Sequence, residues 1–301
     1  MGLIDRALRN GIRVAAWTFD ELYGRDSKFL DGLEDRKQAY VAEIPSDTRV
    51  WTSKPNVIRT VPTKSSQGRP KKTPRVARRR PACEVRNLLK YSSKFQEQSW
   101  QRYRIKDTEK GPEVWEIKWL RVWRKTDTKL PSRQQTLIVA RNVRTGEVKF
   151  FLSNQVVGRD GVTLRWLLRV AFGRWVIEAC FRVAKEELGM DHFEVRGWRC
   201  IHRHYYITAL SSLLCSRIRQ SLDREQTGEL TVEQVRRSAN AYLSYHHLTP
   251  QLRDEAFKKE LADQRYHQER NDQARKSHTK TRIKLYLDLG IDVDKIRSCI
   301  T

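Results

Sequence analysis

Two acidic residues of this sequence stand at positions from which a carboxylate could do chemistry. Asp20 directly follows the apolar run Ile12–Phe19, which predicts a strand buried on both faces. Open α/β sheets gather ligands at the carboxyl ends of their strands, although an acid in that place is also a common turn residue. Glu178 lies within Thr163–Met190, which predicts one long amphipathic helix with Gly189 near its end. A carboxylate at a strand end, as at Asp20, meets solvent and cations while its strand stays rigid.

Three basic residues share a helix face with Glu178. At about 100° per residue, Arg174, Arg182 and Lys185 fall within about 80° of the helix circumference with it. An apolar stripe runs beside this face and consists of Ile177, Phe181, Ala184 and Leu188. The acid is therefore predicted at the edge of the buried face, where it can point into a cleft. The same spacing also fits a solvated face with Glu178 and Arg182 as an ordinary i,i+4 pair.

A βαβ unit is predicted around Asp20. Asp26 or Ser27 can cap a helix after the first strand, and the apolar run Ala39–Ile44 predicts a second strand that stops at Pro45. The helix is expected to turn inward Phe29, Leu30 and Leu33. A strand, a helix and a strand within about thirty residues belong to an α/β layer.

The middle of the chain, from about Glu97, predicts a small antiparallel β module. Thr145 and Gly146 fit the turn of a hairpin. One strand face is expected to carry Trp115, Ile117, Trp119 and Trp123. Core packing is the expected role for most of these tryptophans, and stacking on an extruded or single-stranded base is the alternative.

Helices predominate from about Gly161. The segment Ile201–Leu222 is apolar in its middle and is expected to be buried, and Thr231 with Gln234 fits a capping box. Cys200, His202 and His204 alternate along the sequence, but positions i, i+2 and i+4 of a helix do not converge on one ion. Phosphate or core contacts are therefore expected there in preference to zinc binding.

The charge of the chain points to a nucleic-acid partner. The sequence has 60 Lys and Arg against 36 Asp and Glu, which gives a net charge of +24. Such a surplus repels itself unless a polyanion binds. Residues 64–80 contain no acid and predict an extended basic tether. Within it, Arg69, Lys71 and Lys72 resemble the core of an AT-hook, which lies in the A·T minor groove; we favour the alternative of a generic linker that binds phosphates.

Membrane and secretory classes do not fit the sequence. It has no run of 18 apolar residues, and Asp5 and several arginines stand where a secretory signal would be apolar. The five cysteines are widely spaced without a CxxC pair, which favours a reduced cytosolic compartment over a disulfide framework.

The order of these motifs resembles the DDE transposases of bacterial insertion sequences. Their last acid lies in a Y-x2-R-x3-E-x6-K signature, and Arg174-x3-Glu178-x6-Lys185 matches all of it except the tyrosine, whose position Ala171 occupies. The stretch Asp20–Gly24, D-E-L-Y-G, looks like the second-acid motif of the family, and residues 190–204 resemble the segment after the last acid. The resemblance covers most of residues 3–215 in order.

The resemblance implies a chemistry and a partner. These enzymes have an RNase H-like fold and use Mg²⁺, or Mn²⁺, to attack phosphodiesters with water or a 3′-OH. Asp20 and Glu178 would then be catalytic metal ligands, and Arg174, Arg182 and Lys185 would bind DNA. The partners implied are insertion-sequence ends and target DNA, with a homodimer in the synaptic complex. The implied location is the bacterial cytoplasm, at the nucleoid.

The family also needs a first Asp on the central strand, upstream of the second. The only acid before Asp20 is Asp5, which lies in a helical pattern, and Glu21 faces the other way. We therefore expect a truncated RNase H-like core without its first strands, inactive by itself. The expected organisation is a core remnant at 1–48, a basic linker at 49–95, a β-rich insertion at 96–156, a helical completion with Glu178 at 157–224 and a basic helical tail at 225–301.

Two other functions fit part of the evidence. A non-catalytic nucleic-acid-binding protein would use the charge alone, without convergence of the carboxylates. An RNA-associated protein with basic tails would lack the pairing of a strand-end Asp with a helix-borne Glu. The α/β pattern around Asp20 and the spacing around Glu178 favour the transposase.

Overall fold

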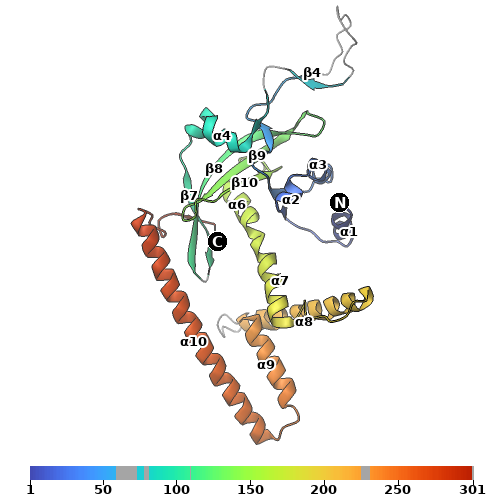
Figure 1. Ribbon diagram of the computed structural model, residues 1–301, viewed down its shortest axis with the longest axis vertical. Helices are drawn as coiled ribbons and strands as arrows, with labels where there is room; N and C mark the ends of the chain where they lie inside the picture. The colour runs from blue at the N-terminus through green and yellow to red at the C-terminus, as the bar shows by residue number, and fades with distance from the viewer. Residues whose placement is uncertain (59–72, 78–80, 109, 225–230, 300–301) are drawn as a thin grey trace, which may run out of the picture. The chain divides into compact units, whose positions relative to one another are not determined.

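The computed structural model describes residues 1–58, 73–77, 81–108, 110–224 and 231–299 (Figure 1). The chain forms two compact units, one of Met1–Arg174 with Thr279–Thr301 and the other of Trp175–His278. The first unit is mixed α/β and the described part of the second is helical. The AT-hook-like residues Arg69, Lys71 and Lys72 lie outside the described residues.

A mixed sheet forms the centre of the first unit. Its main path runs β1-β2-β10-β9-β8-β3-β6, β7 also pairs with β8, and β11 pairs with β7. These strands are β1 (Trp17–Phe19), β2 (Tyr40–Glu43), β3 (Arg49–Trp51), β6 (Cys83–Glu84), β7 (Gln101–Thr108), β8 (Gly111–Lys125), β9 (Pro131–Asn142), β10 (Val148–Ser153) and β11 (Arg297–Ser298). A separate pair joins β4 (Val57–Ile58) to β5 (Arg75–Val76).

The predicted βαβ unit is confirmed. Strands β1 and β2 pair in parallel, with Phe19 opposite Ala42, and are connected through helices α2 (Glu21–Gly24) and α3 (Ser27–Asp35). Asp26 caps α3 by accepting a hydrogen bond from the Phe29 N–H at 3.0 Å. Two of the three residues expected inward on this helix, Leu30 and Leu33, are fully buried, and Phe29 is half-buried.

The prediction of a long, doubly buried first strand is wrong. Only Trp17–Phe19 is strand, and Ile12 and Val14 are 51% and 42% exposed. Ile12 and Val14 precede the strand, and among the described strands β1 ends the path of the sheet, with β2 as its neighbour on one edge only. An edge strand cannot bury apolar residues on every side as a central strand does.

The strands of the β-rich segment pair into the main sheet. Its strands β8, β9 and β10 are antiparallel, and β10 also pairs antiparallel with β2, so that Phe151 lies opposite Glu43. The predicted hairpin turn is confirmed, because Gly146 has a φ of 72° and donates to the Asn142 carbonyl. Strand β10 thereby supplies the hydrogen-bonded neighbour that β2 needs on its second edge.

Helices cover both faces of the sheet. Successive residues of β9 point to opposite faces of the sheet. Ile138 packs with α6 (Leu164–Gly173) on one face, and Leu137 packs with α4 (Val85–Tyr91) and α5 (Ser93–Gln96) on the other. Over β1 and β2 lie α1 (Gly2–Arg9) and α3, which contribute Ile4, Leu30 and Leu33.

The second unit contains α7 (Trp175–Leu188), α8 (Trp198–Arg224), α9 (Val232–Tyr245) and the first part of α10 (Pro250–Asp288). The single helix predicted over Thr163–Met190 is therefore two, which meet at Gly173 and Arg174, and glycine is a weak helix former. The predicted ends are confirmed: Gly189 has a φ of 63° beyond α7, and Thr231 forms a capping box with Gln234.

The prediction of a buried α8 is wrong. Ile207, Leu210 and Leu214 are 65%, 65% and 60% exposed, while Thr208 and Cys215 on the other side are buried. Helices α7 and α9 contact this helix within the second unit and cover one side of it. Within the described residues, every helix is too short or too polar to span a membrane.

The end of the chain returns to the first unit. Tyr286 near the end of α10 is 1% exposed, and its hydroxyl accepts from the Val114 N–H at 3.2 Å. Ile291 and Val293 pack in the same cluster, and β11 pairs in parallel with β7. The segment expected to be a basic helical tail thus also supplies a strand and core residues to the sheet.

The packing of α6 gives a direct test of this fold. Leu168→Ala should lower the free energy of unfolding by about 2–5 kcal/mol, because the side chain is fully buried against the sheet. Leu3→Ala is the control, since Leu3 is 79% exposed on α1 and its loss should change stability by less than about 0.5 kcal/mol. Urea unfolding followed by circular dichroism measures both, and equal losses would contradict this packing.

Candidate active site

Asp20 lies at the carboxyl end of β1, as the sequence predicts. It is the N-cap of α2 and its Oδ1 accepts a hydrogen bond from the Tyr23 N–H at 3.4 Å. The side chain is half-buried, and within the described residues no Lys, Arg or His pairs with it. Asp20 is therefore both a turn residue that caps a helix and a carboxylate at the end of a strand. A carboxylate with one long backbone contact keeps oxygen lone pairs for a cation.

The glycine of the D-E-L-Y-G stretch is required by packing. A Cβ on Gly24 would lie 1.9 Å from the carbonyl oxygen of Glu43 at the end of β2. The turn that begins at Asp20 is therefore pressed against the end of the neighbouring strand. Only a residue without a side chain allows this approach.

Glu43 is an acid at the same edge that the sequence reasoning missed. It is the last residue of β2, and the parallel register that pairs Phe19 with Ala42 places it beside Asp20 along the edge. Its carboxylate pairs with Lys149 of β10 at 3.2 Å and is mostly buried, so Glu43 is already neutralised. The signal that could have found it is its place before Ile44 and Pro45 at a strand end.

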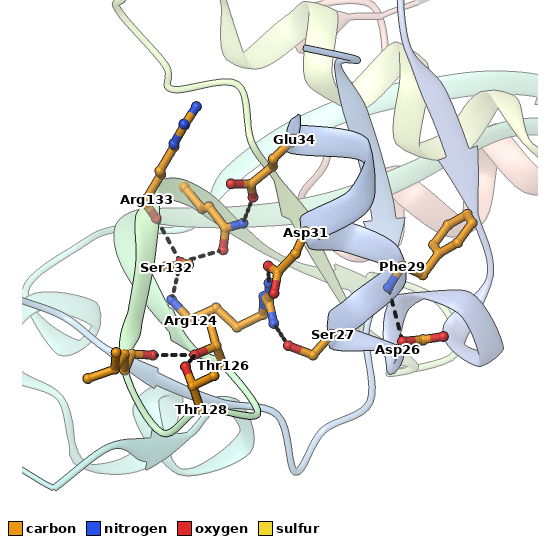
Figure 2. Close-up of polar contacts among 12 residues, drawn as sticks. Asp26, Ser27, Phe29, Asp31, Glu34, Arg124, Thr126, Thr128, Ser132 and Arg133 are labelled. Carbon is orange, nitrogen blue, oxygen red and sulfur yellow. Dashed lines mark hydrogen bonds and ion pairs between the residues drawn. The ribbon is translucent and has the colours of Figure 1, made fainter. Parts of the chain in front are cut away.

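A buried arginine ties the helix that follows Asp20 to the sheet (Figure 2). Arg124 of β8 is 3% exposed and forms an ion pair with Asp31 of α3 at 2.5 Å, and it also donates to the Ser27 hydroxyl. Its Nε has no acceptor among the described residues. The two partners of Arg124 are 93 and 97 positions away from it in the sequence. These contacts therefore fix α3, and with it the turn at Asp20, on the sheet.

A second set of hydrogen bonds adjoins this arginine. The Glu34 Oε1 accepts from the Gln135 amide at 2.8 Å and from the Tyr40 hydroxyl at 3.2 Å. Burial raises the pKa of Glu34, and these hydrogen bonds and the charge of Arg124 only partly offset it. Burial, then the charge of Glu34, raises the pKa of Tyr40 well above its usual value. Tyr40 thus stays neutral and keeps donating to the carboxylate.

Glu178 and its basic neighbours lie in the other unit or at its border. Glu178, Arg182 and Lys185 are exposed on α7, and Arg174 precedes that helix. Arg182 forms an ion pair with Glu186 at 3.6 Å. The alternative of a solvated helix face predicts Glu178 as its partner. Most of the predicted apolar stripe is not core, because Ile177 and Phe181 are 49% and 50% exposed, although Ala184 is buried. Asp20 belongs to the first unit and Glu178 to the second.

The tryptophans of β8 divide between two roles. Trp115 is 2% exposed and packs with Phe172 at a ring distance of 5.0 Å, which confirms core packing there. Trp119 and Trp123 are half-buried and line a hollow of about 400 Å³ with Thr52, Lys94, Gln98, Leu120, Arg121 and Gln134. The Gln98 amide donates to the Trp119 carbonyl and accepts from the Trp119 N–H, and Lys94 donates to the Thr52 carbonyl. Much of the polar lining of the hollow is therefore already hydrogen-bonded.

The remaining candidate ligands have structural contacts. Asp5 accepts two hydrogen bonds from Arg36, which lower its pKa, and so joins α1 to the residue that caps the end of α3. His204 contacts the Gly189 carbonyl at 2.8 Å, and the His202 ring packs on Trp198. All five cysteines are free thiols. Among the described residues, no three His, Cys, Asp or Glu side chains gather as a metal site.

A comparison with protein families covers the part of the chain that contains Asp20. Residues 1–112 match the family model for DDE superfamily endonucleases. No curated protein matches the chain significantly. The family match supports a DDE transposase-like family, whose members cleave DNA and generally use divalent metal ions. The matched region includes Asp20–Gly24 and ends before Glu178, so the match supports the resemblance at the level of the family only.

The Arg124 contacts predict a large effect of one substitution. Arg124→Met should lower the free energy of unfolding by about 1–3 kcal/mol, because it leaves Asp31 and Ser27 without their partner at the helix–sheet contact. Arg133→Met is the matched control, since Arg133 is exposed on β9 and Figure 2 shows it directed away from the cluster. Chemical unfolding of both variants checks this, and equal stabilities would contradict a fastening role for Arg124.

The raised pKa of Glu34 predicts a pH-dependent gain from Glu34→Gln. A carboxyl whose folded pKa is raised stabilises the fold most below its unfolded pKa, and this contribution is lost as the pH rises through the folded pKa. Glutamine keeps the acceptor oxygen without the charge, so the variant should be more stable than wild type at neutral pH. The difference should shrink as the pH falls toward about 4.

Thermal unfolding across this pH range measures the Glu34→Gln effect. Glu21→Gln is its control, because Glu21 forms an exposed surface pair with Arg25. A Glu34→Gln variant that is less stable at neutral pH, or whose difference from wild type is independent of pH, would refute the assignment.

Proposed function

We propose that this chain carries a DNA-cleaving site of the DDE transposase type, with Asp20 and Glu178 as its metal-binding acids. The observation that carries the proposal is the family match over residues 1–112, a range that includes β1 and Asp20. Glu178 is assigned from the sequence signature around it, which has an arginine four residues before it and a lysine seven residues after it. The proposed reaction is strand cleavage and transfer at insertion-sequence ends.

The donor set suits Mg²⁺ or Mn²⁺. Both ions take oxygen ligands, and Asp20 offers a carboxylate whose other contact is one backbone N–H. A bound metal would polarise the phosphodiester and activate the attacking oxygen. Residues of this chain would hold the carboxylate of Asp20 in position for the metal. Strand β1 and the cap of α2 orient Asp20, and Arg124 fixes α3 on the sheet.

The basic residues near Glu178 are the proposed DNA contacts. Arg174, Arg182 and Lys185 would bind phosphates near the cut end, and Arg69, Lys71 and Lys72 would hold the duplex more loosely. The net charge of +24 supports a polyanionic partner. A homodimer on paired DNA ends and a bacterial nucleoid location belong to the same proposal.

The family mechanism uses three carboxylates, and the assignment here provides two. Glu43 is neutralised by Lys149 and Asp5 by Arg36, so neither is proposed as the third. We therefore propose that this chain by itself binds metal and DNA but cleaves slowly or not at all. A basic nucleic-acid-binding protein without metal chemistry is the second candidate, and the net charge alone favours it.

Metal binding separates the two candidates. Mn²⁺ titrated into the protein–DNA complex should bind wild type, and Asp20→Asn and Glu178→Gln should each weaken that binding at least about tenfold, equivalent to about 1.4 kcal/mol. Asparagine caps helices as well as aspartate does, so the first variant keeps the fold.

Asp26→Asn is the matched control, because Asp26 is also an N-cap, of α3. Equal Mn²⁺ affinity in all four proteins would reject the metal site and leave the charge-only alternative. A nicking assay on supercoiled DNA with Mn²⁺ tests the activity; rapid cleavage by this chain alone would overturn the proposed need for another acid.

A further inference from the structure

Three aromatic rings follow one another along an exposed face of α8. The Trp198 and His202 rings lie 4.0 Å apart, and the His202 and Tyr206 rings 6.1 Å apart. The spacing of four residues places all three on one side of the helix. Trp198 is 73% exposed and Tyr206 66% exposed, so large ring surfaces face solvent. Ring surfaces of this size, exposed together within the described residues, mark a candidate binding surface.

Arginines adjoin these rings along the chain. Arg199 and Arg203 each follow one of the rings by a single residue, and Arg196 lies just before the helix. All three are exposed, and in the described residues none forms an ion pair. Residues 198–222 contain no Asp or Glu. By contrast, two arginines of the neighbouring α9 are paired, Arg236 with Glu187 and Arg237 with Glu233.

Other contacts near the start of α8 hold this helix against the segment that precedes it. His204 contacts the carbonyl of Gly189 at 2.8 Å, and Phe193 packs on the rings of His204 and Tyr205. The first turns of α8 are therefore fastened to the turn that ends α7. A fixed platform loses little conformational entropy when a ligand stacks on it.

We propose that Trp198, His202 and Tyr206 form a stacking platform for unpaired bases of single-stranded DNA, with Arg199 and Arg203 on the flanking phosphates. Every base has a flat ring face, and aromatic side chains interleaved with arginine are the means by which proteins bind single strands without reading sequence. A duplex does not offer its ring faces to such a surface, because they are stacked on each other. The proposal rests on the proposed function only for the choice of DNA over RNA.

The ring contacts are tested with a short oligothymidylate that carries one 2-aminopurine. Its fluorescence reports stacking directly, and titration gives the affinity. Trp198→Ala should weaken binding by about 5- to 150-fold, the range measured for loss of one stacked base, and Trp198→Phe should recover most of it. Tyr242→Ala is the matched control, because Tyr242 is 60% exposed on α9 and outside the stripe. Equal affinity for Trp198→Ala and Tyr242→Ala would overturn the platform.

The arginine contacts have a separate readout. The logarithm of single-strand affinity should fall with the logarithm of salt concentration, and Arg199→Ala and Arg203→Ala should each reduce that slope by about 0.7. Arg237→Ala, whose side chain is paired on α9, should leave the slope unchanged. Unchanged slopes for Arg199→Ala and Arg203→Ala would refute their phosphate contacts.

Two further outcomes distinguish this proposal from its rivals. If Trp198→Ala abolishes self-association in sedimentation and leaves the oligonucleotide affinity intact, the face binds a second copy of the chain and the proposal fails. If Trp198→Ala weakens single-strand binding while Asp20→Asn leaves Mn²⁺ binding intact, the platform stands and the proposed metal site fails.

Discussion

The backbone of β2 must be hydrogen-bonded on both edges, and the first unit is organised around that requirement. Tyr40, Val41 and Ala42 are fully buried, so an unpaired N–H or carbonyl group there would be costly. One edge is met in parallel by β1 and the other in antiparallel by β10. A parallel neighbour requires a crossover, which α2 and α3 provide. The crossover brings the carboxyl ends of β1 and β2 together, and Asp20 stands at that edge.

The crossover is held by polar contacts as well as by apolar ones. Leu30 and Leu33 are the buried apolar residues of α3. Asp31 and Glu34 of the same helix contact Arg124 and Gln135 of the sheet directly. Removing such groups from water is unfavourable unless each finds a partner, so the network specifies one position of the helix. The proposed metal ligand therefore sits on a turn fixed from both ends, by the Gly24 approach to Glu43 and by the Arg124 contacts.

The second unit differs in kind from the first. Its helices bury few side chains, and exposed apolar or aromatic residues recur on α7 and α8. In the first unit exposed tryptophan is rare because the sheet and its helices cover the aromatic rings. In the second, rings and unpaired arginines share one face of α8, which is a surface suited to a ligand. The first unit thus carries the proposed ligand Asp20 on a rigid sheet, and the second carries Glu178 and a basic aromatic surface on its helices.

Local patterns determined much of this protein. The apolar runs, the Asp26 and Thr231 caps, the glycine turns at Gly146 and Gly189 and the parallel βαβ unit all follow from interactions within short stretches of chain. The motifs around Asp20 and Glu178 together also indicated a DDE transposase-like family, which the match over residues 1–112 supports.

Only the tertiary structure decided which strand lies at an edge and which residues separated by a hundred positions meet. It exposed Ile12 and the apolar face of α8, merged the β-rich segment with β2, brought β11 back to β7 and joined Arg124 to Asp31. The physical reason is that burial and strand pairing depend on neighbours distant in the sequence. A residue's own type and spacing state what it prefers, but not which partner the fold provides.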